Sequence, residues 1–268
     1  MIHEVLEDRL SALRRCFSTT GSVLVAFSGG VDSTLVLKVA HDVLGPRAVA
    51  VTAVSATMPA LELDATRHLA AEIGATHRIV ETDQLQIPEF VINDGRRCYF
   101  CKTDLYQLLS RLRQEAGTQS IVDGTNVDDL EDDRPGLQAA KEQGVRSPLV
   151  EAELTKDDVR SLARHLGLSN WNKPAAACLS SRIPRGVPIT FEKLSRVERA
   201  EAALVREGFR QFRVRDGGDT ARIELEPDGF TLMDDAGRRQ RITAALKGLG
   251  FKYVTLDLEG YRRGKANS

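Results

Sequence analysis

The chain has 268 residues, of which 42% are hydrophobic and 28% are charged. This is ordinary globular composition, and the length suits one large domain or two modest ones that need neither disulfides nor a structural metal. Lys and Arg number 37 against 38 Asp and Glu, a net charge of −1, so overall charge does not support a nucleic-acid partner. Residues 1–15 lack the apolar stretch of a signal peptide, and no apolar run reaches membrane-spanning length. We therefore expect a cytoplasmic protein without a membrane partner.

The first two thirds of the chain alternate strands with helices after an opening amphipathic helix. We expect strands at 22–27, 47–54, 76–80 and 120–123, and helices at 32–44, 59–73 and 99–113. Gly74 supplies a common stop signal for the second of these helices. Such alternation predicts an α/β fold with a doubly wound parallel sheet covered on both faces.

Residues 169–188 break this rhythm with several prolines, and a long irregular loop of this kind is usually functional or a linker. Beyond it we expect a different order of elements. These are a helix at 191–207, strands at 211–215 and 222–226, a helix at about 231–249 and a strand at 252–258. Two adjacent strands flanked by helices predict a small α+β domain. We therefore divide the chain into domains at 1–186 and 187–268.

A glycine-containing loop follows the first predicted strand, with the sequence Ser28-Gly29-Gly30-Val31-Asp32-Ser33. Glycines let the backbone approach a phosphate, and the amides of the following helix point at it. The loop lacks both the lysine of a Walker loop and the Rossmann glycine pattern. It resembles the PP-loop of ATP pyrophosphatases, which cleave ATP between the α- and β-phosphates. The alternative is a glycine turn with Asp32 as a helix cap.

A second loop, Asp123-Gly124-Thr125-Asn126, ends a later strand. Loops at the carboxyl ends of parallel strands form the ligand crevice of open α/β sheets. We therefore expect Gly124 and Asn126 to lie in the same nucleotide site as the PP-loop.

Three of the four cysteines lie at positions that suit metal binding or thiol chemistry. Cys98 and Cys101 form a Cys-x-x-Cys pair at the start of a predicted helix, and Cys178 stands in the irregular loop. Cys16 is expected to pack as a small hydrophobe. A structural zinc would need a second pair of ligands, and a thioredoxin-like redox pair is one alternative.

Cys98, Cys101 and Cys178 could instead hold a [4Fe–4S] cluster with one iron left open for sulfide. The other interpretation gives the pair a structural role and leaves Cys178 to react alone, and spacing does not decide between them. Arg182 and Lys173 flank Cys178 in the sequence, and nearby cations lower the pKa of a thiol.

Arg213 and Arg215 occupy alternate positions of a predicted strand, so both point to one face. Paired guanidinium groups suit a phosphate or carboxylate ligand. The alternative is a solvated strand face paired with the charged residues at 222–226.

Together these strings resemble the LarE family of ATP-dependent sulfur transferases, which act in nickel-pincer nucleotide biosynthesis. The strings that carry the resemblance are the PP-loop, residues 96–102, 133–136 and 177–184, and the Arg-Val-Arg strand, in this order. The resemblance runs to about Leu258, nearly the whole chain. It implies conversion of pyridinium-3,5-biscarboxylic acid mononucleotide into its bisthiocarboxylic form, the organic part of the lactate racemase cofactor. ATP with Mg²⁺ would adenylylate a carboxylate and release pyrophosphate, and sulfur would then displace AMP.

The resemblance also implies roles for single residues. Arg134 joins the PP-loop residues in nucleotide binding, Arg213 and Arg215 bind the substrate phosphate, and Glu224 is a metal ligand. In single-cysteine members the cysteine matching Cys178 gives up its own sulfur and becomes dehydroalanine. Arg182 lies beside it in the same motif, and we expect Cys178 and Arg182 to be the catalytic residues.

Cys98 and Cys101 depart from the single-cysteine pattern. The resemblance to three-cysteine members implies a [4Fe–4S] cluster that passes on sulfide, and we favour it over a sacrificed Cys178. A tRNA thiolase is the nearest rival, but it would need a basic face or an RNA-binding module. Amide-forming NAD or GMP synthetases have no need for Cys178, and a non-enzymatic nucleotide-binding regulator would not turn over ATP. Family precedent implies a homo-oligomer acting on a small mononucleotide, without a nucleic-acid partner.

Overall fold

The computed structural model describes residues 2–130, 135–174 and 177–262. The chain folds into two compact units. The first unit comprises Met1–Thr82 with Cys98–Ala176, and the second comprises Asp83–Arg97 with Ala177–Ser268. Residues 83–97 and 177–186 therefore belong with the C-terminal residues, whereas the domain division predicted from the sequence falls after residue 186. In the described parts of the chain, no helix combines the length and the apolar character needed to cross a membrane.

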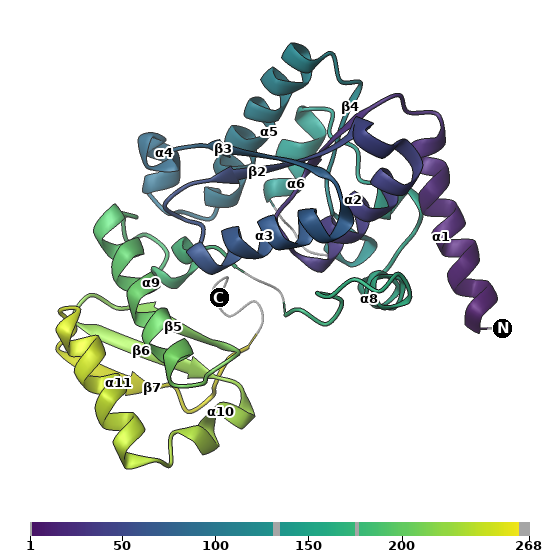
Figure 1. The fold of residues 1–268 in the computed structure, drawn as a ribbon. Coiled ribbons are helices and arrows are strands. Elements are labelled where there is room, and N and C mark those ends of the chain that lie inside the picture. The colour runs from purple at the N-terminus through teal and green to yellow at the C-terminus, as the bar shows by residue number, and fades with distance from the viewer. Residues whose placement is uncertain (1, 131–134, 175–176, 263–268) are drawn as a thin grey trace. The chain divides into compact units, whose positions relative to one another are not determined.

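A parallel sheet in the order β3-β2-β1-β4 forms the centre of the first unit, as predicted. Its strands are β1 (Val23–Ala26), β2 (Ala48–Val54), β3 (Thr76–Glu81) and β4 (Ser120–Val122). β1 pairs with β2 on one side and with β4 on the other, so the winding of the chain reverses between β1 and β4 (Figure 1). Ligands of open α/β sheets bind beyond the carboxyl ends of the strands at this reversal.

Helices cover both faces of this sheet (Figure 1). One face packs on α1 (Ile2–Ser18), α2 (Val31–Leu44), α3 (Ala60–Ile73), α7 (Pro148–Glu151) and α8 (Lys156–His165), and the other on α5 (Arg97–Ala116) and α6 (Pro135–Glu142). Val23 and Val25 of β1 belong to the first core and Leu24 to the second. This alternation is the two-residue period of a strand buried on both faces.

Most of the predicted elements of the first unit are confirmed to within a few residues. Gly74 ends α3 in the left-handed conformation, with φ of 78°, and its amide donates to Ala70 and Ala71 carbonyls. The sequence pattern did not predict α8 of the first unit, nor several short elements in the two units. These are η1 (Gly45–Arg47), η2 (Gln84–Gln86), α4 (Pro88–Val91), η3 (Val127–Leu130), α6 and α7. Most span only three or four residues, too few to show a periodicity.

The second unit contains a small mixed sheet in the order β5-β6-β7. β5 (Phe212–Asp216) runs antiparallel to β6 (Thr220–Leu225), and β7 (Tyr253–Leu256) runs parallel to β6. One face packs on α9 (Phe191–Arg206) and α11 (Ala236–Gly248). This confirms the predicted α+β character of the C-terminal part.

The single helix predicted at about 231–249 is wrong. Two helices lie there, α10 (Pro227–Leu232) and α11. The Asp235 side chain accepts a hydrogen bond from the Arg238 amide and caps α11. An aspartate in this position has an extended backbone and begins a new helix, so a single continuous helix cannot pass through Asp235.

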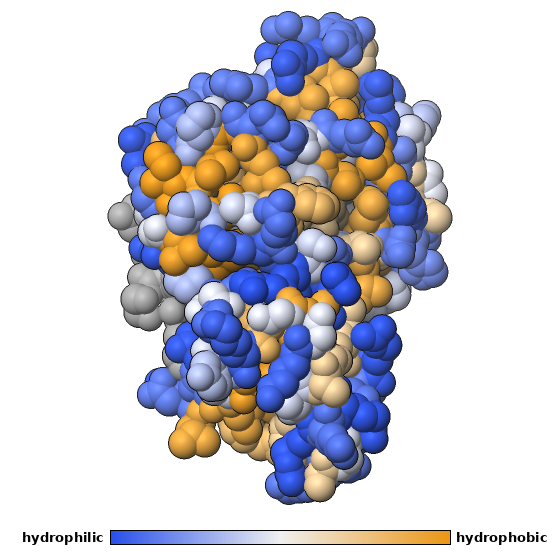
Figure 2. All heavy atoms as spheres, turned by 90° about the vertical axis from the view of Figure 1, so that its left-hand side faces the viewer, coloured by the Kyte–Doolittle hydropathy of each residue, from blue (hydrophilic) through white to orange (hydrophobic). Residues whose placement is uncertain are grey.

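Large exposed hydrophobic side chains are found in both units, and on the face drawn in Figure 2 hydrophobic side chains are interleaved with hydrophilic ones. They include Leu61 and Ile79 in the first unit and Phe191 and Tyr253 in the second. Single exposed apolar residues of this kind are normal on a folded protein.

Candidate functional site

The PP-loop joins β1 to α2, as the sequence predicted. Gly30 is the N-cap of α2, and Gly29 has φ of 69°, a conformation that favours glycine. The Ser28 and Ser33 hydroxyls lie 3.2 Å apart, and Ser33 Oγ donates to the Gly30 carbonyl over 3.1 Å. The amides of a first helical turn have no acceptor within the helix, so this turn can bind an anion.

The loop after β4 lies against the PP-loop. A Cβ at Gly124 would come within 2.7 Å of the Ser33 amide nitrogen and 3.0 Å of the Asp32 carbonyl carbon. Asn126 Nδ2 donates to Asp32 Oδ1 over 3.0 Å. The structure thus brings Gly124 and Asn126 to the PP-loop, at the reversal between β1 and β4. The helix-cap alternative for Asp32 is wrong, because Gly30 occupies the cap and the Asp32 carboxylate binds Asn126 and Lys156.

Two lysines that the sequence analysis did not place in the nucleotide site contact the PP-loop. Lys156, the first residue of α8, pairs with the Asp32 carboxylate. Lys173 Nζ donates to the Gly29 carbonyl over 3.3 Å and to Glu62 over 2.7 Å. The loop that lacks a Walker lysine therefore has two ammonium groups beside it. A Thr155-x-x-Asp158 capping box marks the start of α8 and was the signal that could have located Lys156.

Asn170 approaches the PP-loop from the segment after α8. Its Nδ2 donates to the Gly29 carbonyl over 3.2 Å and to Thr34 Oγ1 over 2.9 Å. Its Oδ1 is buried and has no hydrogen-bond partner among the described residues. A buried acceptor of this kind fits a donor group supplied by a ligand.

Asp123 fixes the shape of the second loop. Its Oδ1 accepts from the Thr125 amide and from Ser147 Oγ, at 3.1 Å and 2.8 Å. Its Oδ2 accepts from the Tyr106 hydroxyl and from Thr125 Oγ1, both at 2.9 Å. Burial raises the pKa of Tyr106, so its hydroxyl stays protonated and remains a donor.

Cys98 and Cys101 lie near the start of α5 and outside any disulfide, the first exposed and the second half-buried. Residues three apart share one face of a helix. Within each unit, the described residues include no group of three or more His, Cys, Asp or Glu side chains arranged to hold a metal ion. Cys16 packs against the core as predicted, and burial raises the pKa of its thiol.

Cys178 belongs to the second unit, where it is exposed and precedes the short helix η4 (Leu179–Arg182). Its Sγ lies 2.9 Å from Ser180 Oγ. The sequence led us to expect Arg182 beside this thiol, but the hydrogen bonds of Arg182 to described residues go to other groups. Its guanidinium donates to the carbonyls of Ala177 and Cys178 at 2.7 Å and 3.0 Å, and it forms two bonds to Glu201. Arg182 therefore supports the backbone around Cys178, while Lys173 is engaged at the PP-loop of the first unit.

Residues 83–97 anchor the Cys178 loop from the same unit. Asn93 is fully buried with φ of 61°, and its Nδ2 donates to the carbonyls of Pro184 and Val187 at 2.8 Å and 3.0 Å. Arg97 Nη1 donates to the Ser180 carbonyl over 3.1 Å. A strained, buried residue held by several bonds indicates a loop whose conformation is fixed.

The predicted Arg-Val-Arg strand is β5, and its arginine face is not solvated. Arg213 is 7% exposed, and the Arg215 side chain is 11% exposed. Arg215 donates to Glu224 Oε2 over 2.8 Å and to the Ser181 carbonyl over 2.6 Å, while its buried Nε has no partner among the described residues. The alternative of a solvated strand face is therefore wrong in its exposure, whereas the pairing that it expected with charged residues at 222–226 is confirmed. A buried guanidinium with a spare donor suits an anionic ligand.

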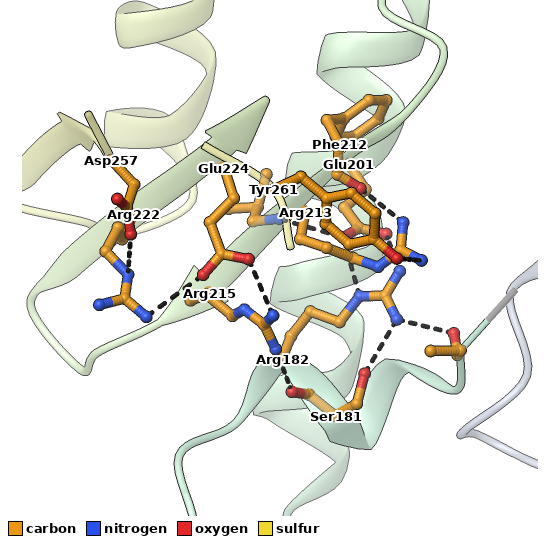
Figure 3. A network of polar contacts seen from close by, with 12 residues as sticks. Ser181, Arg182, Glu201, Phe212, Arg213, Arg215, Arg222, Glu224, Asp257 and Tyr261 are labelled. Atoms are coloured by element: carbon orange, nitrogen blue, oxygen red, sulfur yellow. Dashed lines mark hydrogen bonds and ion pairs between the residues drawn. The ribbon is translucent and has the colours of Figure 1, made fainter. Parts of the chain in front are cut away.

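Glu224, predicted as a metal ligand, lies directly opposite Arg213 on β6 and is fully buried. It accepts from Arg215 through one oxygen and from Arg222 through the other, at 2.8 Å and 3.3 Å. In this structure it therefore serves as the counter-ion of two arginines (Figure 3). Arg134 lies outside the described residues.

Arg182 and Arg213 carry two further guanidinium groups of this polar network, and Arg182 pairs with Glu201 (Figure 3). Burial, and then the neighbouring Arg182, lower the pKa of Arg213. Like charges held together in a buried place favour the binding of an anion. We refer to Arg182, Arg213, Arg215 and Arg222 as the arginine face.

Comparisons with known proteins identify one matching family and several similar proteins. Residues 3–92 match the asparagine synthase family. The chain is 48% identical to an uncharacterized protein of Synechocystis sp. over 98% of both chains. It is 43% identical to the pyridinium-3,5-bisthiocarboxylic acid mononucleotide synthase of Lactiplantibacillus plantarum, over 91% of this chain and 88% of that protein. It is 30% identical to the glutamine-hydrolyzing GMP synthase of Aeropyrum pernix, over 69% of this chain and 39% of that protein.

Proposed function

This chain belongs to the LarE family of ATP-dependent sulfur transferases, and from that membership we propose the reaction that it catalyses. It adenylylates the carboxylates of pyridinium-3,5-biscarboxylic acid mononucleotide and converts them into thiocarboxylates. The observation that carries this proposal is the similarity to the Lactiplantibacillus synthase, which extends over both units of the chain. The PP-loop in the first unit and the arginine face in the second are the groups that such a reaction requires.

In the first step, ATP binds as its magnesium complex with its phosphates at the PP-loop. The amides at the start of α2 and the hydroxyls of Ser28 and Ser33 hold the pyrophosphate portion. A substrate carboxylate oxygen attacks the α-phosphorus, and the bond from this phosphorus to the bridging oxygen breaks. Pyrophosphate leaves with the electron pair, and fixed donors at the loop stabilise the charge that develops on it.

In the second step, the arginine face holds the phosphate of the mononucleotide while sulfur replaces the activated oxygen. Arg213 and the spare Nε of Arg215 supply the donors. A thiolate attacks the acyl carbon, and AMP leaves with the electron pair of the former carboxylate oxygen. Cys178 is exposed, as a nucleophile must be.

We further propose that Cys98, Cys101 and Cys178 ligate a [4Fe–4S] cluster. The donor set fits this group in its chemistry, because all three are cysteines outside any disulfide and the pair shares one helix face. When bound, the cluster would supply sulfide at its open iron and would spare the sulfur of Cys178. Without the cluster, Cys178 itself would form a thioester with the substrate. Loss of the Cα proton and cleavage of the Cβ–S bond would then leave a thiocarboxylate and dehydroalanine.

The reaction is tested by incubating the purified protein with MgATP and the biscarboxylic mononucleotide under anaerobic conditions. We expect pyrophosphate and AMP, and a product whose mass shows oxygen replaced by sulfur. Cys178→Ala should still release pyrophosphate but form no thiocarboxylate, whereas Cys16→Ala should behave as wild type. An amide product from ammonia, or pyrophosphate release that does not need the substrate, would contradict the proposal.

The cluster is tested by measuring iron and acid-labile sulfide in wild type and in Cys98→Ala after anaerobic reconstitution. We expect about four irons per chain in wild type and a loss in the variant. An iron-free protein whose own mass falls by one hydrogen sulfide after a single turnover would show that Cys178 is sacrificed. The homo-oligomeric state and the cytoplasmic location expected from the sequence remain predictions.

A further inference from the structure

Tyr261 lies against the guanidinium group of Arg213 (Figure 3). The centroid of its ring is 4.8 Å from Arg213 Cζ, and its hydroxyl is 3.5 Å from an η nitrogen of Arg213. The face of an aromatic ring attracts a guanidinium through the ring quadrupole. Arg213 also donates to the carbonyl of its neighbour Phe212 over 2.6 Å. The arginine is thus held by an aromatic face and a backbone oxygen.

The backbone fixes the position of Tyr261. The Gly260 amide donates to the Asp257 carbonyl over 3.0 Å in a turn after β7, and Gly260 has φ of 69°. A Cβ at Gly260 would lie 2.6 Å from the Leu225 carbonyl oxygen, so only glycine fits there. The Tyr261 amide then donates to that same carbonyl over 2.8 Å. The C-terminal turn therefore presents the tyrosine ring to the arginine face from the end of β6.

Arg213 needs such support because its surroundings oppose its charge. It is 7% exposed, and the Arg182 guanidinium is its neighbour. Glu201, the carboxylate partner of Arg182, favours the charge of Arg213 in turn, and Arg215 on the same strand pairs with Glu224. The face of the ring stabilises the cation without accepting its N–H bonds, and the Tyr261 hydroxyl accepts from one η nitrogen only over a long 3.5 Å.

We propose that Tyr261 is a positioning residue that holds the Arg213 guanidinium ready for the phosphate of the mononucleotide substrate. This inference rests on the proposed function, in which Arg213 binds that phosphate. It assigns a role to the C-terminal turn, which follows the last strand of the small sheet. The ring acts on the ligand through Arg213, so its effect should depend on the presence of the phosphate.

The first test compares Tyr261→Leu with Tyr261→Phe. The leucine variant loses the aromatic face, and we expect the KM for the mononucleotide to rise about five- to ten-fold with little change in kcat. The phenylalanine variant keeps the face and should stay within about two-fold of wild type. Tyr253→Leu is the matched control, because Tyr253 is 64% exposed on β7 of the same sheet. Thermal unfolding of each variant checks that the unit remains folded.

The second test measures binding by calorimetry without ATP, using the mononucleotide and the nucleoside that lacks its phosphate. Wild type should prefer the mononucleotide, and Tyr261→Leu should lose much of this preference while binding the nucleoside as wild type does. Equal weakening toward both ligands, or no weakening, would overturn the role of Tyr261 and leave the proposed function intact. A wild type that binds both ligands equally would overturn the phosphate role of Arg213, and the Tyr261 proposal with it.

Discussion

The PP-loop and the arginine face are the two anion sites that we propose, and they are built in different ways. At the PP-loop the binding groups are backbone amides at the start of α2, shaped by Gly29 and closely packed against Gly124. At the arginine face they are side chains from η4, β5 and β6, and buried carboxylates hold them in place. The first site depends on space for the backbone and the second on pairing of charges. We therefore expect the PP-loop to be disrupted by added side-chain atoms and the arginine face by removal of a charge.

Removing the charge of Glu224 is expected to have the largest effect. Glu224→Gln leaves Arg215 without its buried counter-ion, which should lower the free energy of unfolding by about 3–5 kcal/mol. Urea unfolding of the purified variant measures this. Asp219→Asn is the control, since the Asp219–Lys252 pair is exposed and should contribute little to the free energy of unfolding. Equal losses in the two variants would show that charge pairing does not hold the arginine face together.

Filling the space at Gly124 should disrupt the PP-loop without changing any charge. In Gly124→Ala the new Cβ meets backbone atoms of Asp32 and Ser33, so the loop must shift. We expect kcat/KM for ATP to fall about 100-fold, which corresponds to about 2.7 kcal/mol. Pyrophosphate release measures this, with Gly248→Ala as a control because no atom lies within 4 Å of its added Cβ. Normal ATP use by the Gly124 variant would rule out a tightly fitted backbone site.

Lys156 refines this comparison, because it forms an ion pair with Asp32 at the PP-loop, where the binding groups are otherwise backbone amides. Lys156→Met removes the ammonium group beside Asp32, and we expect about a ten-fold loss in kcat/KM for ATP. Lys38→Met is the matched control, since Lys38 pairs with Asp42 on the same helix α2. If both variants keep full activity, ATP use does not need the Lys156 ammonium group.

The smallest expected effect is the response of the first unit to pH. His77 Nε2 lies 2.8 Å from Thr52 Oγ1, which donates to the carbonyl of Phe27 next to the PP-loop. Burial lowers the pKa of His77 below its usual 6.5. The unfolded chain therefore binds more protons just below that pH, and the free energy of unfolding should fall as the pH drops through 6.5. Urea unfolding midpoints should change less with pH in His77→Gln than in wild type, and an equal change would contradict the prediction.

Local features allowed much of the first unit to be predicted from the sequence. The strands β1 and β2 carry continuous apolar runs, and the PP-loop is a contiguous string in which Gly29 has a backbone conformation that favours glycine. The predictions failed where no local period exists. The short helices after β4 were not identified, and the capping role of Asp235 was overlooked within an apparently continuous helix. Lys156 could not be assigned to the PP-loop because it lies 124 residues further along the chain than Asp32.

The sequence by itself determined the α/β class, the PP-loop and the family resemblance, because each depends on neighbouring residues. Only the tertiary structure decided which groups meet. It placed Lys156 and Lys173 at the PP-loop, turned Arg182 toward Glu201, and buried Glu224 between two arginines. The physical reason is that strand alternation specifies which face a side chain occupies, whereas burial and charge partners depend on the segments that the fold packs against that face.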